Sequence, residues 1–135
     1  MKKMVTYLTF DGACNKAMKF YQKCFGGDLN MIPFSEAPDA KMKSQGDRIM
    51  HSNLVIDDMT LMASDSMPGH PYKIGNTSSI YLECESMAEV KKMFASLSEG
   101  GKVTMPLADT FWGAHFGCCE DKFGVQWMMS FSKPQ

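Results

Sequence analysis

The sequence lacks the segments that would send a protein into or across a membrane. Its start, MKKMVTYLTF, has neither the apolar run nor the small-residue cleavage site of a signal peptide. No stretch approaches the roughly 20 apolar residues that a membrane-spanning helix needs. An excess of one charge is missing too, since the net charge is −1 and Lys2-Lys3 is too short a basic patch for nucleic acid or an anionic membrane. We therefore expect a soluble, cytoplasmic protein with neither kind of partner.

The number and spacing of the cysteines argue against two further classes of protein. The five cysteines are odd in number and contain no CxxC pair, which argues against a disulfide framework and a zinc ribbon. Cys14 and Cys24 fall in a predicted helix, and the adjacent Cys118 and Cys119 point to opposite faces of a predicted strand. We expect reduced, buried thiols.

Common catalytic motifs are also absent. There is no Ser-His-Asp order, Walker loop or GxSxG pattern, and no Gly-rich nucleotide loop between a strand and a helix. The length of 135 residues, with 44% hydrophobic and 21% charged residues, suits one globular domain or two tightly packed modules. Fourteen methionines suit an adaptable apolar pocket, although core filling alone also explains them.

What the sequence does contain is an internal repeat. Residues 8–31 align with residues 82–105 at an offset of 74, and a second alignment, at an offset of 64, matches His51 with His115. The two offsets differ only because the second copy has a shorter connection. A repeat of this size predicts two supersecondary units that share a buried face, with a pocket at the seam between them.

Each copy predicts the element order βαβββ. The first has expected strands over residues 5–10, 28–34, 48–56 and 59–65. The second has them over residues 77–84, 102–106, 114–119 and 125–131. Asp11 is the expected cap of the first helix, a capping box at Ser86–Glu89 begins the second, and Gly26-Gly27 and Gly100-Gly101 end them. Polar residues 35–46 are an expected loop and a candidate lid.

These predictions give an α+β fold of two modules, 1–66 and 77–135, joined by the connector 67–76. Helices are expected to cover one face of each sheet, and the concave faces to combine into an open barrel around a cavity. The whole chain, 1–135, is expected to form a single domain.

Five segments resemble one known family: Tyr7–Gly12, Met50-His51, Leu61–Asp65, Asp109–Gly113 and Asp121–Trp127. They are similar to the PhnB-like proteins, also labelled 3-demethylubiquinone methyltransferase-like, of the vicinal oxygen chelate superfamily. That superfamily includes glyoxalase I, bleomycin-resistance proteins and extradiol dioxygenases. The resemblance covers nearly the whole chain and implies a glyoxalase/bleomycin-resistance-type open barrel and a homodimer. The methyltransferase label gains no support from the sequence, which lacks the nucleotide loop.

Metal-dependent members of this superfamily take four ligands from the first and last strands of each module. Mapped onto this chain, the four positions hold Val5, Ser64, Ser79 and Met128. Valine has no donor atom, methionine is a soft thioether, and serine hydroxyls are poor ligands for a divalent ion. A catalytic zinc site normally needs three ligands from His, Glu, Asp or Cys. We therefore expect no metal and no cofactor.

Two histidines are the leading candidates beside these positions. If Asp57-Asp58 form a two-residue turn, His51 lies opposite Ser64. A two- or four-residue turn in the second hairpin would place His115 on the face of Met128, whereas a three-residue turn or a bulge would reverse this. The alternative for each histidine is a half-buried side chain bonded to a neighbour. His70, in the connector, is expected to be solvated.

Other candidates share strand parity with these positions or flank the expected cavity. Asp65 either caps a turn or orients His51 as the second member of a catalytic pair. Trp112 either plugs the core or forms an aromatic wall over a ligand, and Asp121 is expected to serve a turn. The expected ligand-binding residues are Tyr7, Thr9, Ser64, Ser79, Tyr81, Trp112, His115, Gln126 and Met128.

Three functions stay open at this point. The first is a protein that binds a small organic molecule in a metal-free cavity. The second is an enzyme acting on a small polar metabolite, with His51 and Asp65 as an acid–base pair. The third is an antibiotic-sequestering protein like the bleomycin binders, which an acidic groove for a cationic drug would indicate.

Overall fold

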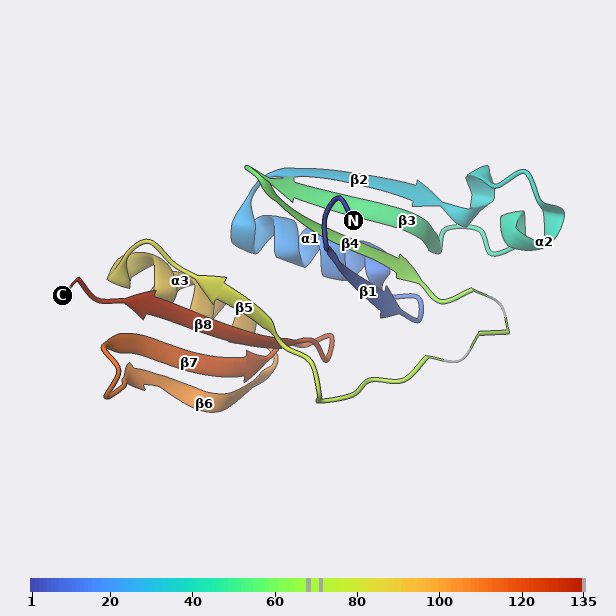
Figure 1. Ribbon diagram of the computed structural model, residues 1–135. Coiled ribbons are helices and arrows are strands. Elements are labelled where there is room, and N and C mark those ends of the chain that lie inside the picture. The colour runs from blue at the N-terminus through green and yellow to red at the C-terminus, as the bar shows by residue number, and fades with distance from the viewer. Residues whose placement is uncertain (68, 71, 135) are drawn as a thin grey trace. The chain divides into compact units, whose positions relative to one another are not determined.

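The chain folds as two compact units, Met1–Lys73 and Ile74–Gln135. The computed structural model describes residues 1–67, 69–70 and 72–134, so two prolines of the predicted connector, at 68 and 71, lie outside the described residues. Each unit has one four-stranded mixed sheet and one long helix (Figure 1). The predicted pair of βαβββ modules in an α+β fold is confirmed.

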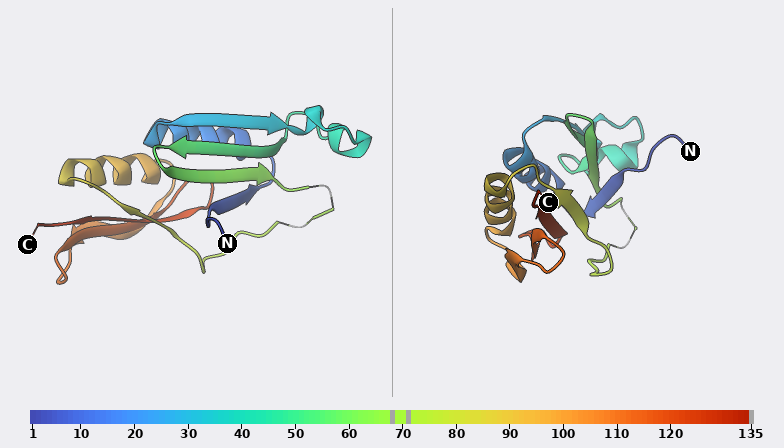
Figure 2. Two further views of the ribbon diagram at one scale, coloured as in Figure 1. Left: turned by 45° about the horizontal axis from the view of Figure 1, so that its top comes forward. Right: turned by 60° about the vertical axis from the view of Figure 1, so that its left-hand side comes forward.

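The first unit is built on one sheet with the strand order β1-β4-β3-β2. Its main elements are β1 (Thr6–Phe10), α1 (Cys14–Phe25), β2 (Asp28–Pro33), β3 (Ile49–Ile56) and β4 (Met59–Asp65). Strand β1 runs parallel to β4, and the other neighbours are antiparallel. Helix α1 packs across β2, β3 and β4 on one face (Figures 1 and 2). Side chains alternate accordingly, so that Leu54, Leu61 and Ala63 are buried on the helix side.

Residues 35–46 differ from the predicted loop. A 3₁₀ turn, η1 (Phe34–Glu36), leads into them from the end of the predicted strand, and they contain a short helix, α2 (Ala40–Lys43). Asp39 begins α2 because its Oδ2 accepts a hydrogen bond from the Met42 backbone N–H at 3.0 Å. The loop prediction is therefore wrong over these residues, and Phe34, which is buried, anchors the segment.

The second unit repeats the order with the strands β5-β8-β7-β6. Its elements are β5 (Ile80–Glu83), α3 (Met87–Ser98), β6 (Lys102–Asp109), β7 (Ala114–Glu120) and β8 (Gln126–Ser132). Helix α3 packs across β6, β7 and β8. Ser86 caps it as predicted, its Oγ accepting from the Glu89 N–H at 3.0 Å, but the Glu89 carboxylate accepts from the Glu85 N–H instead of that of Ser86.

The two hairpins differ in the length of their turns. In the first, Ile56 pairs with Met59 around Asp57-Asp58, as predicted. In the second, Glu120 pairs with Gln126, which leaves the five-residue connection 121–125. A connection with an odd number of residues shifts β8 by one residue relative to the predicted register, so the other set of alternate β8 side chains shares a face with a given β7 residue.

Asp121 shapes this longer connection. Its Oδ1 accepts from the N–H groups of Phe123, at 2.8 Å, and Val125, at 3.1 Å, and its Oδ2 accepts from Trp127 Nε1 at 2.8 Å. The predicted turn role of Asp121 is confirmed. The hydrogen bond from the Trp127 indole to Asp121 accompanies a connection of five residues, 121–125, in place of the predicted two- or four-residue turn.

The thiols are buried to different extents. Burial raises the pKa of Cys14, and of Cys84, from 9.0 to about 11. Because the thiolate is the reactive form, we expect iodoacetamide at pH 8 to leave both unmodified in the folded protein. Half-exposed Cys24, on the same helix as Cys14, is the internal control and should react first. Peptide mass spectrometry measures the alkylation, and rapid labelling of Cys14 without denaturant would contradict this burial.

Within the ranges that the structure describes, no helix is long and apolar enough to cross a membrane.

Candidate functional site

The first sheet has a face turned away from α1 that gathers several of the predicted residues. Thr9 pairs with Ser64, Tyr7 pairs with Met62, and His51 pairs with Ile32. By strand alternation these side chains share one face with Val55 and with Asp28, Asn30 and Ile32 of β2. We use the name Tyr7 face for seven of its members: Tyr7, Thr9, His51, Asn53, Thr60, Met62 and Ser64. The predicted placement of His51 on the side of Ser64 agrees with this register.

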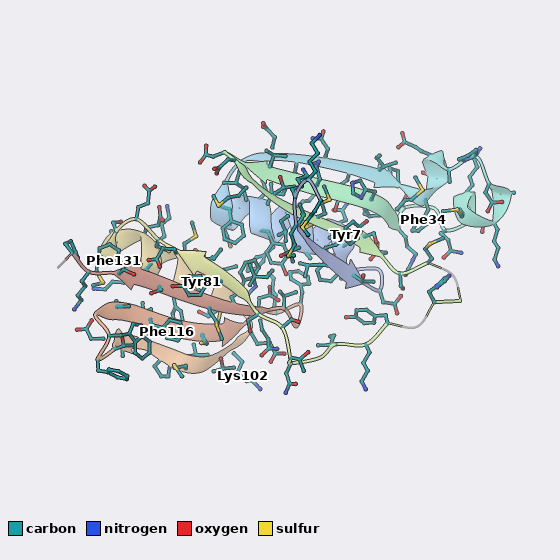
Figure 3. The ribbon with its side chains drawn as sticks, in the orientation of Figure 1. Tyr7, Phe34, Tyr81, Lys102, Phe116 and Phe131 are labelled. Atoms are coloured by element: carbon teal, nitrogen blue, oxygen red, sulfur yellow. The ribbon has the colours of Figure 1, made fainter. Side chains whose placement is uncertain are left out.

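Tyr7 and His51 form the centre of this face. The Tyr7 hydroxyl lies 3.0 Å from His51 Nδ1, and the two rings stack with centroids 5.7 Å apart. Tyr7, which is labelled on β1 in Figure 3, keeps 48% of its surface exposed. If Tyr7 donates, imidazole Nε2–H is left as a donor; if Nδ1–H donates, Nε2 becomes an acceptor and the phenol O–H is free to donate. Either way the pair presents one donor and one acceptor.

Asn53 belongs to the same face and was not predicted. Its neighbours across the sheet are Met62 on β4 and Asn30 on β2. Its Oδ1 is buried and has no hydrogen-bond partner in the described part of the chain. An unsatisfied buried acceptor costs about 1–3 kcal/mol, so a small rotation of the amide toward a donor would be favourable. The alternation His51-Ser52-Asn53 was the signal that could have identified it.

Asp65 lies on the opposite side of the sheet from His51. It is 1% exposed, and its carboxylate accepts from three backbone N–H groups: Gly12 at 2.7 Å, Cys14 at 3.1 Å and Ile49 at 2.8 Å. Strand alternation separates it from the neighbouring Ser64 and therefore from His51. The predicted His51–Asp65 pair is wrong, because Asp65 ties the start of α1 to β3.

Asp11 does not cap α1 either. The Asp65 carboxylate already binds the first helical N–H group, that of Cys14, and the Asp11 carboxylate forms an ion pair with Arg48 at 3.0 Å. The prediction from sequence proximity is wrong because a carboxylate from the end of β4 occupies that place.

The second sheet brings together a different group of predicted residues. Tyr81 on β5 pairs with Met128 on β8, on the face turned away from α3, where Phe116 and Cys118 of β7 also lie (Figure 3). A hydrogen bond with Ser130 lowers the pKa of Tyr81, but burial and the nearby Glu83 carboxylate outweigh it and raise the pKa above its usual value. This face is rich in aromatic and sulfur-containing side chains.

Gln126 and Ser79 have structural surroundings in the same unit. The Gln126 amide Nε2 donates to the carbonyl oxygens of Gly75, at 3.4 Å, and Ser78, at 3.3 Å. Ser79 lies just before β5 and outside the strand. Gln126 therefore holds the segment that leads into β5, and a role of either residue in ligand binding stays a prediction.

His115 lies on the face opposite Met128. It pairs with Phe131, and the five-residue connection after β7 puts it on the same side as Trp127. Its Nδ1 lies 2.8 Å from Asp109 Oδ1, which Lys133 Nζ also approaches to 2.8 Å. Hydrogen bonds from Lys133 and His115 lower the pKa of Asp109. The predicted repeat-related pair of histidines is wrong, since Phe116, and not His115, faces the side of Met128.

Trp112 is 59% exposed, which excludes the core plug. Its ring forms T-shaped contacts with Phe111 and Phe116, with centroids 5.1 and 6.0 Å away. The aromatic-wall alternative stays a prediction.

The four expected ligand positions differ in where they lie relative to the strands. Val5 and Ser79 come just before the first strand of their units, while Ser64 and Met128 lie within β4 and β8. Among the residues with described positions, no three side chains of His, Cys, Asp or Glu form a group that could hold a metal ion.

Comparison with known proteins finds one matching family model and several similar proteins. The family model described as 3-demethylubiquinone-9 3-methyltransferase matches residues 2–130. Protein YjdN of Escherichia coli (strain K12) is 35% identical over 141 residues, which cover 96% of this chain and 95% of that protein. The crystal structure of protein PA1353 from Pseudomonas aeruginosa is 43% identical, with a TM-score of 0.90 over 99% of this chain and 100% of that one.

More distant structures show the same fold. A PhnB protein from Bacillus cereus is 25% identical, with a TM-score of 0.77 over 97% of this chain and 100% of that one. A glyoxalase/bleomycin resistance protein from Albidiferax ferrireducens T118, at 12% identity, has a TM-score of 0.64 over 97% and 99% of the two chains. Together with the paired βαβββ modules, these matches show that the chain belongs to the PhnB-like, 3-demethylubiquinone-9 3-methyltransferase family and shares the fold of the glyoxalase/bleomycin resistance protein.

Proposed function

We propose that this protein binds a small, polar, uncharged organic molecule on the Tyr7 face. The observation that carries the proposal is the hydrogen-bonded Tyr7–His51 pair on a partly exposed sheet face. A paired phenol and imidazole are held in one geometry before a ligand arrives, which lowers the ordering cost of binding.

The chemistry of the face favours a ligand with a carbonyl or hydroxyl group. Tyr7 and His51 together offer one donor and one acceptor, and the hydroxyls of Thr9 and Ser64 lie on paired positions beside them. Met62 adds a flexible apolar surface next to Tyr7. None of the seven side chains of the Tyr7 face is a carboxylate, a lysine or an arginine, so hydrogen bonds and apolar contact would supply the affinity.

Binding is favoured over acid–base catalysis by the partner of His51. A general base is commonly oriented by a carboxylate, and here the imidazole meets a tyrosine hydroxyl while Asp65 is engaged on the other side of the sheet. An enzyme built on His51 and Asp65 therefore has no support in the geometry of the first unit.

A thermal-shift screen of uncharged carbonyl and hydroxyl fragments tests the proposal. For the fragments that raise the melting temperature, calorimetry should give at least about tenfold weaker binding to His51→Ala, or about 1.4 kcal/mol. Tyr7→Phe should weaken binding severalfold, because it removes one hydrogen-bonding group and keeps the ring.

His115→Ala is the matched control, since it removes the other strand histidine from a different face. Its affinity should stay within about twofold of the parent value. Fragments that bind His51→Ala and Tyr7→Phe as tightly as the parent would overturn the proposal.

A further inference from the structure

The first unit has a polar pocket that shares no residue with the Tyr7 face. It lies where the parallel strands β1 and β4 end, beyond Phe10 and Asp65, and has a volume of about 360 Å³. We call it the Arg48 pocket; the described residues that line it are Asp11, Gln45, Arg48, Ser66, Met67, Gly69, His70 and Tyr72. Pockets for small ligands begin at about 300 Å³, so its size suits a small molecule.

Arg48 is the only arginine of the chain and is held firmly in this pocket. Its Nη2 donates to the Ser66 carbonyl oxygen at 3.0 Å and to Ser66 Oγ at 3.1 Å, and pairs with Asp11 Oδ1 at 3.0 Å. Gly12, with a φ of +92°, passes beside the guanidinium, and a Cβ there would lie 3.4 Å from Nη1. Two chain segments, residues 11–12 and residue 66, thus position one cation.

Part of the guanidinium keeps its hydrogen-bonding capacity. Within the described ranges Nη1 makes no hydrogen bond, and Nε is buried without a partner. A planar guanidinium with free donors binds carboxylate and phosphate oxygens with favourable geometry. The hydrogen-bonding side chains around it, including Gln45, His70 and Tyr72, can bind the remainder of such a ligand.

Asp11 is the single acidic side chain of the lining, and it is 62% exposed. Exposed ion pairs contribute little, typically less than about 1 kcal/mol, so an incoming anion can take the place of this carboxylate. We propose that the Arg48 pocket binds a small organic anion, a carboxylate or a phosphate ester, through Arg48, and that Asp11 is the internal competitor that the anion displaces.

The single arginine makes a direct test possible. In a ¹H–¹⁵N spectrum its Nε–H gives one resonance, which can be followed while benzoate or inorganic phosphate is added at constant ionic strength. We expect saturable movement of this resonance with at least one of the two probes. Movement with benzoate alone identifies a carboxylate site, and movement with phosphate alone identifies a phosphate site.

Asp11→Asn separates this site from general charge attraction. It should tighten binding of the active probe about threefold, because the competing carboxylate is lost. Asp58→Asn makes the same charge change at the other end of β4 and should leave the affinity unchanged. Arg48→Lys should weaken binding at least about tenfold, measured by the ligand's own resonances, because lysine cannot reproduce the planar donor set.

Two results would overturn the proposal: an Arg48 resonance that neither probe moves, or equal affinities for the Asp11→Asn and Asp58→Asn proteins. Should Arg48→Lys fail to fold, the comparison of the two aspartate variants still decides the matter, since both aspartates are exposed. Neither result bears on the Tyr7 face, whose test uses uncharged fragments.

Discussion

Replacing Asp65 by alanine is expected to lower the free energy of unfolding by about 3–5 kcal/mol. The carboxylate is buried and accepts from the N–H groups of Gly12, Cys14 and Ile49, so the variant leaves three backbone donors with no acceptor. Two of these donors lie at the start of α1 and the third at the start of β3. Urea denaturation followed by circular dichroism measures the change.

Asp58→Ala is the control for this prediction, because Asp58 is exposed in the turn before β4. Its effect should stay within about 0.5 kcal/mol. If Asp65→Ala instead unfolded at the same urea concentration as the parent protein, the structural role of Asp65 would be wrong and its place in a catalytic pair would need to be reconsidered.

The glycine pair after α1 should show the second large effect. Gly26 and Gly27 both have positive φ, +76° and +89°, and the ψ of Gly26 is −157°, so alanine at either position is strained by about 1–3 kcal/mol. The two glycines differ in the room around them. A Cβ on Gly26 would meet nothing within 4 Å, whereas a Cβ on Gly27 would collide with the backbone carbonyl of Val55. We expect Gly27→Ala to cost at least about 3 kcal/mol, because β3 must move to admit the methyl group.

Gly26→Ala is therefore the matched control for Gly27→Ala, and the difference between the two unfolding free energies isolates the steric term. The second copy of the repeat offers a check, since a Cβ on Gly101 collides in the same way with the carbonyl of Glu120. Equal destabilisation by Gly26→Ala and Gly27→Ala would show that the backbone at Gly27 does not lie as close to the Val55 carbonyl as described.

Local sequence signals predicted the fold well. Apolar periodicity and the glycine pairs located both long helices and all the main strands, and the Asp57-Asp58 turn set the register that places His51 with Ser64. These features depend on residues close together in the chain.

The errors arise where residues distant in sequence decide the outcome. Asp11 is adjacent to α1, but Asp65 from the end of β4 binds the helix start. The second hairpin needs a five-residue connection because Asp121 also binds the Trp127 indole, and this reverses the face of His115. The Arg48 pocket combines segments without periodicity, so no spacing pattern indicated it.

The central claim, that the Tyr7 face is a ligand site, is tested most directly by methyl-labelled methionine NMR with the uncharged fragment set. Met62 lies beside Tyr7 on this face, whereas Met18 of α1 is fully buried and serves as the reference. We predict that binding fragments shift the Met62 methyl resonance, leave that of Met18 in place, and lose this effect with His51→Ala. Fragments that saturate the protein without moving Met62 would contradict the claim.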